Sequence, residues 1–425
     1  MAKRDFDVVV LGATGFTGQR VAAYLAERAA ETDLRWAPAA RDADKLQRVL
    51  ADHGVQAPEL LHVDIDEPAT LRDLCARATV VLNMVGPYAK FGPPVIEAAI
   101  AEGAHYVDLT GEMPFVRDMI DAHHDAAHAA QVKLVQVCGF ESLPPDLAVG
   151  LVARAAREEL GEELAEVTIR VTSELPPGLP RPSDLISGGT FQSLRLAVAS
   201  DDAGAIADPA ILVQDPARAK RVREDSPVSV RPRRGTGTEA LAPMVPSPFL
   251  NPAVIHRSNE LLASEGAELG SSLTYREHMA LPGGTPTLGP RLAAAAVVSA
   301  TAAGTRALAS APGPVRRAAA SGLKAIGPGS GDGPAPDRLE GWSWTVQCDA
   351  RTTGGAGVHL LIEADGHPGY LTTARMMGEA GMLLAETEAT PDRYGCVTPS
   401  LALGLDEVDR FARAGLRFSA VCVDA

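Results

Sequence analysis

A glycine-rich segment near the N-terminus, GATGFTG at 12–18, lies between an apolar β-branched run and a helical pattern. This context is typical of the strand–turn–helix unit that binds dinucleotides. Gly12 allows a sharp turn, Gly15 allows the backbone to approach a pyrophosphate, and Gly18 allows the helix to pack closely on the sheet. The helix N-terminus would present N–H groups and a partial positive charge to the phosphates. The segment therefore predicts a Rossmann-type domain.

Strands and helices alternate over the first 138 residues, as in a doubly wound parallel sheet. Strands are expected at 6–11, 35–40, 60–63, 79–85, 105–109 and 132–138, and helices at 15–30, 42–53, 68–77, 94–102 and 114–130. Later elements are helices at 144–157, 370–385 and 403–414, and strands at 167–172, 342–350 and 358–364. We predict an α/β fold: a Rossmann-type doubly wound parallel sheet at 1–150 and an α+β substrate and dimerisation domain at 151–395. Residues 396–425 are expected to form a C-terminal helix that packs back on the Rossmann domain.

The end of the second expected strand favours NADP(H) over NAD. It reads Ala39-Ala40-Arg41-Asp42, and Lys45 follows one helical turn later. NAD-selective sites usually have an acidic residue at the strand end, where it binds the ribose 2′-hydroxyl. Arg41 can instead pair with a 2′-phosphate and stack on adenine, while Asp42 suits a helix N-cap. A solvated surface arginine is the alternative interpretation of Arg41.

Ligands of such sheets bind at the carboxyl ends of the strands. Asp64 ends the third strand, near the expected adenine, and Asn83–Tyr88 follows the fourth, near the ribose and nicotinamide. The predicted cofactor-binding residues are Gly12, Thr14, Gly15, Phe16, Thr17, Gly18, Arg41, Lys45, Asp64, Asn83, Val85, Gly86, Pro87 and Tyr88.

Two further loops on the same edge, Asp108–Glu112 and Gly139–Asp146, carry carboxylates and hydroxyls that suit substrate anchoring or proton relay. Helix capping by Asp108, Glu112 and Asp146 explains these residues about equally well. Tyr88 and Glu141 are the candidate catalytic residues. Hydride transfer needs no protein nucleophile, because the cofactor carries that chemistry, and no GxSxG elbow is present.

Metal binding and disulfides are not expected. His124 and His128 share one helix at i, i+4 spacing with His123 beside them, but a metal site needs a third ligand, so we predict a polar helix face. Five widely spaced cysteines without a CxxC pair favour reduced thiols. The N-terminal residues lack the apolar stretch of a signal peptide, so we expect a cytoplasmic protein.

Charge and hydropathy bear on the possible partners. The formal net charge of −15 makes the chain a poor general binder of nucleic acid. The longest apolar run, Leu292–Thr305, is shorter than the roughly 20 residues that span a bilayer. We expect it to form a buried helix, and peripheral contact with a lipid or membrane surface is the alternative.

Several longer motifs resemble one known family over nearly the whole chain. They are GATGFTG (12–18), AAR (39–41), VGPYAKFGPPVIEAA (85–99), YVDLTGE (106–112), VCGFESLPPDLAV (137–149), ISGGT (186–190), GPGSGDGP (327–334) and GHPGYLTTARM (366–376). The chain resembles the saccharopine dehydrogenase-like oxidoreductases, in particular the actinobacterial trans-acting enoyl reductases. It departs from the family pattern at Glu141 and His367, where Asp is usual, and at Pro145, where Ser is usual. These departures concern the substrate rather than the fold.

The resemblance implies an NADP(H)-dependent oxidoreductase that reduces the C=C bond of an enoyl thioester, either a small molecule or an acyl chain on a carrier protein. A homodimer is also expected. Two alternatives stay open. A saccharopine reductase-like amino-acid dehydrogenase would act on a C–N bond and need clustered arginines, for which Arg195, Arg231, Arg233 and Arg234 show no clear anchor pattern. A dinucleotide-binding, lipid-associated protein would bind NADP(H) without turnover.

Overall fold

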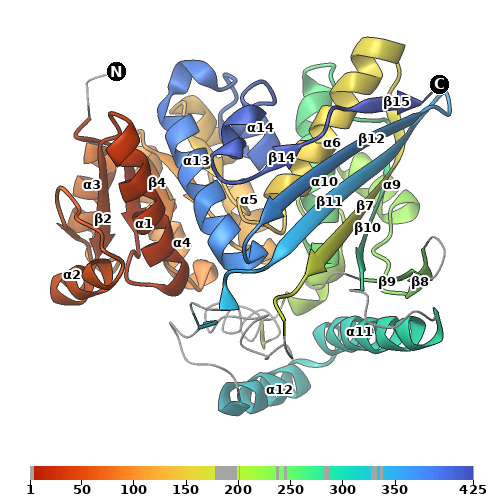
Figure 1. The fold of residues 1–425 in the computed structure, drawn as a ribbon, viewed down its shortest axis with the longest axis horizontal. Helices are drawn as coiled ribbons and strands as arrows, with labels where there is room; N and C mark the ends of the chain where they lie inside the picture. The colour runs from red at the N-terminus through yellow and green to blue at the C-terminus, as the bar shows by residue number, and fades with distance from the viewer. Residues whose placement is uncertain are drawn as a thin grey trace.

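A computed structural model describes residues 4–177, 199–200, 202–235, 239–243, 247–281, 288–326, 333–335 and 338–424. Two β-sheets lie side by side, with helices around and between them (Figure 1). The ISGGT motif at 186–190 and most of the GPGSGDGP motif at 327–334 lie outside the described residues.

The first sheet is the predicted Rossmann sheet. Its described strands are all parallel, in the order β13-β6-β5-β4-β1-β2-β3. The strands are β1 (Phe6–Leu11), β2 (Trp36–Ala40), β3 (Leu61–His62), β4 (Ala78–Asn83), β5 (His105–Asp108), β6 (Lys133–Val135) and β13 (Gly395–Val397). The connecting helices are α1 (Phe16–Glu31), α2 (Ala43–Asp52), α3 (Pro68–Arg77), α4 (Tyr88–Glu102) and α5 (Met113–Ala129). Strands that are covered on both faces need apolar residues on both, which explains the nearly continuous apolar run of β4.

Helix α4 begins six residues before its predicted start at 94, although Pro93 and Pro94 lie inside it. The carboxylate of Glu112 accepts hydrogen bonds from the backbone N–H groups of Tyr88 (3.0 Å) and Ala89 (2.9 Å). A distant side chain therefore caps the first turn, which no local sequence pattern revealed.

The second sheet is mixed, and its main order is β14-β12-β11-β7-β10-β9-β8, with β15 also paired to β12. Its strands are β7 (Leu164–Glu174), β8 (Arg233–Arg234), β9 (Ala240–Ala242), β10 (Thr274–Ala280), β11 (Ser343–Thr352), β12 (Gly357–Asp365), β14 (Arg417–Phe418) and β15 (Cys422–Asp424). Buried and less buried residues alternate along β11 and β12, so each strand turns one face to the core. Helix α6 (Leu143–Ala155) covers that face.

The predicted C-terminal helix at 403–414 is wrong. The described C-terminal elements are α14 (Pro399–Leu403), a 3₁₀ turn at Val408–Ala412, and the strands β14 and β15. Gly404 ends α14 with a φ of +79°, a conformation that favours glycine and stops the helix there. Since β14 and β15 pair with β12, the end of the chain joins the second sheet.

Helix α13 (Thr373–Ala385) ties the two parts of the chain together, and it lies between the two sheets (Figure 1). A Cβ at Gly378 would lie 2.5 Å from Tyr24, so only glycine allows α13 to approach α1 this closely. Glu379 is 1% exposed, and its Oε1 accepts hydrogen bonds from the Tyr24 hydroxyl (2.7 Å) and from Arg28 Nε (2.8 Å). This buried ion pair specifies how α13 packs on α1.

The second part also contains α9 (Pro216–Asp225), α10 (Asn251–Ser264), α11 (Leu288–Ala309) and α12 (Gly313–Ile326). The expectation of a buried helix at 292–305 is wrong. Within Arg291–Ala309 only 22% of the segment is buried, although length and composition alone would let it cross a membrane. Ala295 and Ser299 face the protein, whereas Val297 is 67% exposed. Alanine periodicity is weak, so the sequence alone did not distinguish a core helix from a surface helix.

Replacing Arg28 by alanine should lower the free energy of unfolding by about 3–5 kcal/mol, because the buried Glu379 carboxylate would lose its counter-ion. Urea denaturation measures this change. Arg413→Ala is the matched control, since Arg413 is 67% exposed and 4.0 Å from Glu31; its effect should stay within about 0.5 kcal/mol. Equal effects of the two substitutions would contradict the assigned role of the buried pair.

Candidate functional site

The carboxyl ends of four parallel strands lie at one level of the first sheet. Leu11 pairs with Ala39 on one side and with Asn83 on the other, and Asn83 pairs with Asp108. The glycine-rich loop and the loops after β2, β4 and β5 therefore leave the sheet at the same edge. In doubly wound sheets this edge is where ligands bind.

The glycine-rich loop at 12–18 has no side chain at Gly12, Gly15 and Gly18, and the concave backbone at these glycines is called the cradle below. Gly12 has a φ of +87°, and a Cβ there would lie 2.6 Å from Val85 Cγ2. A Cβ at Gly18 would lie 2.3 Å from the Gly12 carbonyl oxygen. Gly15 is the N-cap of α1 and offers no capping side chain, so N–H groups of the first turn are left for a ligand. The residues present therefore fit a bound pyrophosphate.

Other residues of this loop are half-buried, among them Thr14, Phe16 and Thr17. The Phe16 ring meets Tyr370 edge to face, with ring centroids 5.0 Å apart. Gly333 packs on the same ring, where a Cβ would lie 2.4 Å from two ring carbons. Segments of the second part of the chain thus lie against the loop.

The contact with Tyr370 continues as a series of rings. His367 lies 4.6 Å from Tyr370, and Trp342 lies 4.5 Å from His367, between ring centroids. All three rings are buried. Sequence reasoning missed this series, and the only signal was that His367 stands where the family usually has Asp.

Arg41 and Lys45 follow β2, and both side chains are exposed. Within the described part of the chain, no residue forms an ion pair with Arg41. Asp42 Oδ1 accepts a hydrogen bond from the backbone N–H of Lys45 at 2.8 Å, which confirms the predicted N-cap. Within the described residues, neither the Arg41 nor the Lys45 side chain forms an ion pair that would compete with a phosphate, although Asp42 and Asp44 lie close by in sequence.

Asp64 and Asn83 are engaged in local hydrogen bonds. Asp64 Oδ1 accepts from the backbone N–H of Asp66 at 3.1 Å, and its side chain remains half-buried. Asn83 is fully buried; its Oδ1 accepts from the Val85 N–H at 3.0 Å and its Nδ2 donates to the Tyr106 hydroxyl at 3.1 Å. Asn83 thus holds the Val85–Gly86–Pro87 turn, whose Gly86–Pro87 bond is cis, against the glycine-rich loop.

Tyr88 is buried beneath this turn. Its hydroxyl donates to the Asn83 carbonyl at 3.2 Å. Burial, and then the charge of Asp108, raise the pKa of Tyr88 well above its ordinary value, while a hydrogen bond from the Leu109 backbone opposes the shift. The Tyr88 proton is therefore bound tightly at neutral pH.

Asp108 is fully buried at the end of β5. Its Oδ1 accepts from the N–H groups of Thr110 (3.0 Å) and Val137 (3.2 Å), and its Oδ2 accepts from the Tyr106 hydroxyl (2.8 Å). Burial raises the pKa of Asp108 to about 7 despite these donors. Val137 has a φ of +59°, which is rare for a β-branched residue and costs about 1–3 kcal/mol. Strained backbone of this kind clusters at functional sites.

Helix capping explains two of the remaining carboxylates. Glu112 caps α4 as described above, and Asp146 Oδ2 accepts from the Ser400 N–H in the first turn of α14 at 2.7 Å. Asp146 Oδ1 also accepts from the Ser258 hydroxyl at 2.8 Å. Both capped helices are distant from these carboxylates in sequence.

Glu141 lies in the loop after β6, and its side chain is half-buried. Its Oε2 is 3.4 Å from where a Cβ would stand at Gly139, a position that is also 3.5 Å from Leu109 Cβ. Burial raises the pKa of Glu141. The carboxyl group therefore lies between the ends of β5 and β6.

Sequence reasoning missed two residues of the second part of the chain: Asn251, which contacts this loop, and Glu277, which contacts Asn251. Asn251, at the start of α10, donates Nδ2 to the Glu141 carbonyl (2.6 Å) and to Glu277 Oε2 (2.8 Å). The Ser142 hydroxyl donates to Asn251 Oδ1 at 2.7 Å. Glu277, from β10, is 5% exposed. Its surroundings in sequence carry no motif, so only the packing of the two sheets identifies it.

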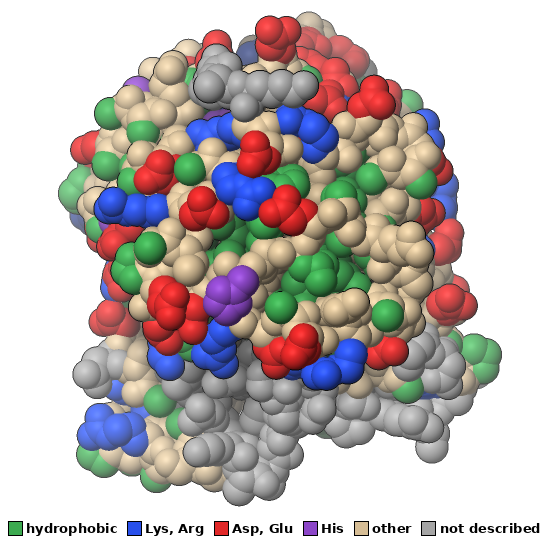
Figure 2. Space-filling view, turned by 90° about the vertical axis from the view of Figure 1, so that its left-hand side faces the viewer, with side chains coloured by type: hydrophobic (Ala, Val, Ile, Leu, Met, Phe, Trp, Pro, Cys, Tyr) green, Lys and Arg blue, Asp and Glu red, His purple; other side chains and the backbone are tan. Residues whose placement is uncertain are grey.

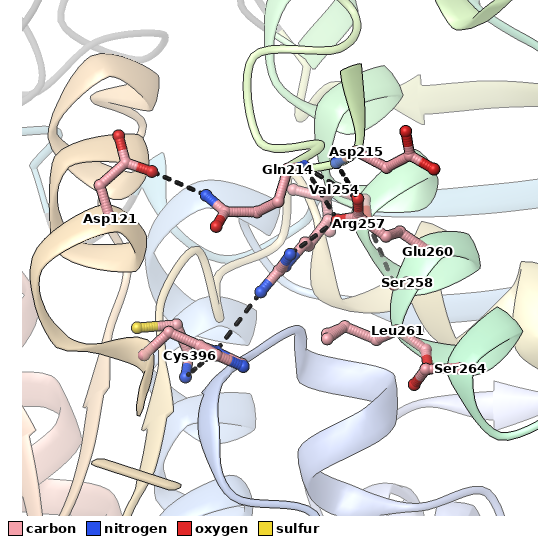
Figure 3. Close-up of polar contacts among 11 residues, drawn as sticks. Asp121, Gln214, Asp215, Val254, Arg257, Ser258, Glu260, Leu261, Ser264 and Cys396 are labelled. Atoms are coloured by element: carbon pink, nitrogen blue, oxygen red, sulfur yellow. Dashed lines mark hydrogen bonds and ion pairs between the residues drawn. The ribbon is translucent and has the colours of Figure 1, made fainter. Parts of the chain in front are cut away.

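His124 has a packing role at the junction of α5, α10 and β13, where its partners Arg257 and Cys396 lie (Figure 3), whereas His128 is exposed. His124 Nδ1 accepts from the Cys396 N–H at 3.2 Å and lies 3.4 Å from Arg257 Nη2. Arg257 is 3% exposed and also donates to Glu260 at 2.7 Å, whose carboxylate accepts from the Gln214 N–H at 2.8 Å. Among the described residues, no group of three or more potential ligands could hold a metal ion.

All five cysteines are free thiols; Cys422 is exposed and the other four are buried.

On the face drawn in Figure 2, acidic and basic side chains are interspersed around a shallow apolar area. Described residues on that face form no continuous basic patch of the kind that nucleic acid requires.

Comparison with known proteins agrees with this geometry. The family model of the saccharopine dehydrogenase NADP binding domain matches residues 8–135. Trans-acting enoyl reductases of Mycobacterium ulcerans and Mycobacterium tuberculosis are each 32% identical, over 431 and 427 residues; the alignments cover 99% and 98% of this chain and 98% and 97% of the relatives. A further M. tuberculosis relative is 34% identical over 430 residues, 97% of both chains.

Solved structures support the fold. Saccharopine dehydrogenase (L-Glu forming) from Saccharomyces cerevisiae has a TM-score of 0.51 and 12% identity, with 98% of this chain and 99% of that chain covered. Homospermidine synthase from Legionella pneumophila, in complex with NAD, has a TM-score of 0.50 and 11% identity, with coverage of 99% and 92%. The fold and the cradle thus define an NADP(H)-dependent oxidoreductase with a saccharopine dehydrogenase-like architecture. Within that class, the chain belongs to the family of the trans-acting enoyl reductases.

Arg41→Ala should raise the Kd for NADPH by about 10- to 100-fold and leave the Kd for NADH nearly unchanged, because only NADPH carries the 2′-phosphate. Isothermal titration calorimetry with both dinucleotides measures this. Arg48→Ala, an exposed arginine further along α2, is the matched control. A parallel loss of affinity for both dinucleotides would contradict a contact with the 2′-phosphate.

Proposed function

We propose that this protein reduces the C=C bond of an α,β-unsaturated acyl thioester with NADPH. The observation that carries the proposal is the near-full-length similarity to trans-acting enoyl reductases, combined with a dinucleotide cradle whose sheet edge also holds carboxyl groups of raised pKa. The substrate would be a small-molecule thioester or an acyl chain on a carrier protein.

Each group of residues has a proposed role in this reaction. The loop at 12–18 holds the pyrophosphate, Arg41 and Lys45 hold the 2′-phosphate, and Asp64 lies beside the adenine. Bound NADPH supplies a hydride to the β-carbon of the substrate. The enolate that results needs hydrogen-bond donors and then a proton at its α-carbon.

Glu141 is our leading candidate for the proton donor, since it is half-buried and its pKa is raised. Tyr88, whose proton is held on the Asn83 carbonyl, is the second candidate. We propose that Asn83, Val85, Gly86 and Pro87 form the wall beside the nicotinamide ribose.

Deuterium transfer tests the function directly. The protein is incubated with NADPH deuterated at C4 and with 2-enoyl thioesters of coenzyme A and of acyl carrier protein, in short and long chains. We expect one deuterium at the β-carbon and one solvent hydrogen at the α-carbon, read by mass spectrometry. Gly18→Val should abolish transfer, because its Cβ would clash with the Gly12 carbonyl oxygen and displace the loop that forms the cradle.

The other outcomes of this experiment separate the alternatives. Tight NADPH binding with no deuterium in any acyl product would favour the non-catalytic dinucleotide-binding protein. Oxidation of the cofactor by 2-oxo acids with amines, and not by enoyl thioesters, would favour the amino-acid dehydrogenase.

We also propose that α11 contacts a lipid surface, which would suit a long acyl substrate. From His278 to Gly331 the sequence contains no acidic residue but five Arg or Lys, in a chain whose net charge is −15. Exposed small apolar side chains of α11, such as Val297, lie within this cationic segment. Apolar burial combined with attraction to anionic headgroups is the usual basis of peripheral binding.

Vesicle co-sedimentation tests this contact. Val297→Asp should reduce the fraction bound to vesicles containing anionic phospholipid several-fold, because a carboxylate adds both charge repulsion and a desolvation cost. Leu60→Asp, at a 36% exposed position just before β3, is the control and should bind as the parent does. A parent protein that stays in the supernatant contradicts the proposal.

The cytoplasmic location and the homodimer remain predictions. Light scattering, which measures the molar mass in solution, tests the homodimer.

A further inference from the structure

A cavity of about 530 Å³ lies at the amino ends of β5 and β6, and none of the residues proposed for the reaction lines it. His105 begins β5, Lys133 begins β6, and both line the cavity. The dinucleotide edge is at the other end of these strands, where Asp108 ends β5. A strand rises about 3.3 Å per residue, so about 10 Å of backbone separates His105 from Asp108. The cavity is therefore separate from the dinucleotide edge, and its volume is typical of small-molecule sites.

The inner part of this cavity contains a buried cation. Lys133 is 2% exposed, and its Nζ donates to Thr390 Oγ1 (2.7 Å), which also lines the cavity, and to the Ala402 carbonyl (3.0 Å). The centroid of the Tyr394 ring is 5.9 Å from Nζ. Within the described residues, no carboxylate forms an ion pair with Lys133, and its third N–H has no acceptor. Because buried charges in proteins are normally paired, Lys133 calls for an anionic partner.

His105 places a second donor beside Lys133. It is 3% exposed, and its Nδ1 accepts a hydrogen bond from the Lys133 backbone N–H at 3.1 Å. Burial, followed by the charges of Lys133 and Arg4, lowers the pKa of His105 to about 4. The ring is therefore neutral at pH 7 and carries its proton on Nε2, from which no described residue accepts a hydrogen bond. An ammonium and an imidazole N–H in one cavity suit a carboxylate.

The outer part of the cavity carries the opposite charge. Glu388 and Asp392 line it and are exposed. Asp392 Oδ1 accepts from the Tyr394 hydroxyl at 3.0 Å. A ligand with only a negative charge would be attracted by Lys133 and repelled by these two carboxylates. A positive group on the same ligand, placed toward the outer part, would turn the repulsion into attraction.

We propose that this cavity binds a small zwitterion of the α-amino acid class. Its carboxylate lies against Lys133 and His105, and its ammonium group points toward Asp392 and Glu388. An α-amino acid carries both charges on one short fragment, which matches a cavity that is cationic inside and anionic outside. Since the site is across the sheet from the cradle, its ligand is an effector and not the substrate. The inference is independent of the proposed enoyl reduction.

The charges around Lys133 agree with this site. Burial lowers the pKa of Lys133 to about 8, while Asp392 raises it and Arg393 lowers it. Lys133 therefore stays mostly protonated at neutral pH, and a carboxylate bound beside it would offset the cost of burying its charge. Arg393 pairs with Glu265, with 2.8 Å between Nε and Oε1 and 2.7 Å between Nη2 and Oε2, so it is engaged outside the cavity.

Isothermal titration calorimetry with the proteinogenic L-amino acids, on the protein saturated with NADPH, tests the site. At least one amino acid should bind. The carboxylic acid and the amine that match it, each lacking one charged group, should bind at least about tenfold more weakly. Lys133→Met should abolish measurable binding and keep the fold, because an apolar side chain of similar length replaces a buried charge.

Asp392→Asn provides a second variant at an exposed position, and its amide oxygen can still accept from Tyr394. It should weaken binding of the amino acid about two- to fivefold, the effect of losing one exposed ion pair. The matched carboxylic acid should respond in the opposite direction and bind more tightly, because a repulsive charge is removed. Glu363→Gln, at an exposed position on β12, is the control and should bind the amino acid as the parent does.

Three results would overturn the proposal. The first is a parent protein that binds none of the amino acids. The second is a matched carboxylic acid that binds as tightly as the amino acid, which would indicate a site for simple anions. The third is binding that Lys133→Met leaves unchanged, since the amino acid would then bind elsewhere. If Lys133→Met fails to fold, the opposite responses of amino acid and acid to Asp392→Asn decide, and equal responses overturn the site.

Discussion

The two sheets share one apolar core, and this constraint determines where the chemistry can take place. A single cluster of buried side chains runs from Val8 in β1 through Val149 in α6 to Val346 in β11. The Phe140 and Trp344 rings meet within it, with centroids 4.8 Å apart. Burial of each such aliphatic or aromatic side chain stabilises the fold by about 1.5–3 kcal/mol. Separation of the two sheets would expose many of them to water and is therefore strongly unfavourable. Loops of the first sheet are therefore held against β10 and α10 of the second part.

This shared core explains why so many acidic groups near the sheet edge keep raised pKa values. Asp108 and Glu277 are buried and Glu141 is half-buried, and burial is the largest cause of the raised pKa for each of them. A protein that needed only stability would have replaced such groups with apolar residues of similar volume. Their retention beside a dinucleotide cradle is consistent with a reaction that moves protons.

Local patterns predicted some elements well and others poorly. Strands β1 to β6 of the Rossmann sheet were predicted to within a few residues, because β-branched runs bounded by glycine or proline mark them clearly. Strand β13, which pairs with β6 in the same sheet, was not predicted. The start of α4 was missed because its cap is Glu112, which is distant in sequence. The burial of 292–305 and the helix at 403–414 were wrong. In the first case alanine carries little periodic signal, and in the second Gly404 and pairing with β12 outweighed the helical pattern.

The sequence by itself determined strands β1 to β6 of the Rossmann sheet, the glycine cradle and the basic residues that favour NADP(H), because each depends on residues that are close together in the chain. Tertiary structure alone decided which groups surround the rest of the site. Glu277, Asn251 and the Tyr370 series reach the sheet edge only because the second sheet packs on α6 and the chain returns through α13. Contacts between residues far apart in sequence follow from the packing of whole helices and strands, and no local pattern in a single sequence predicts them.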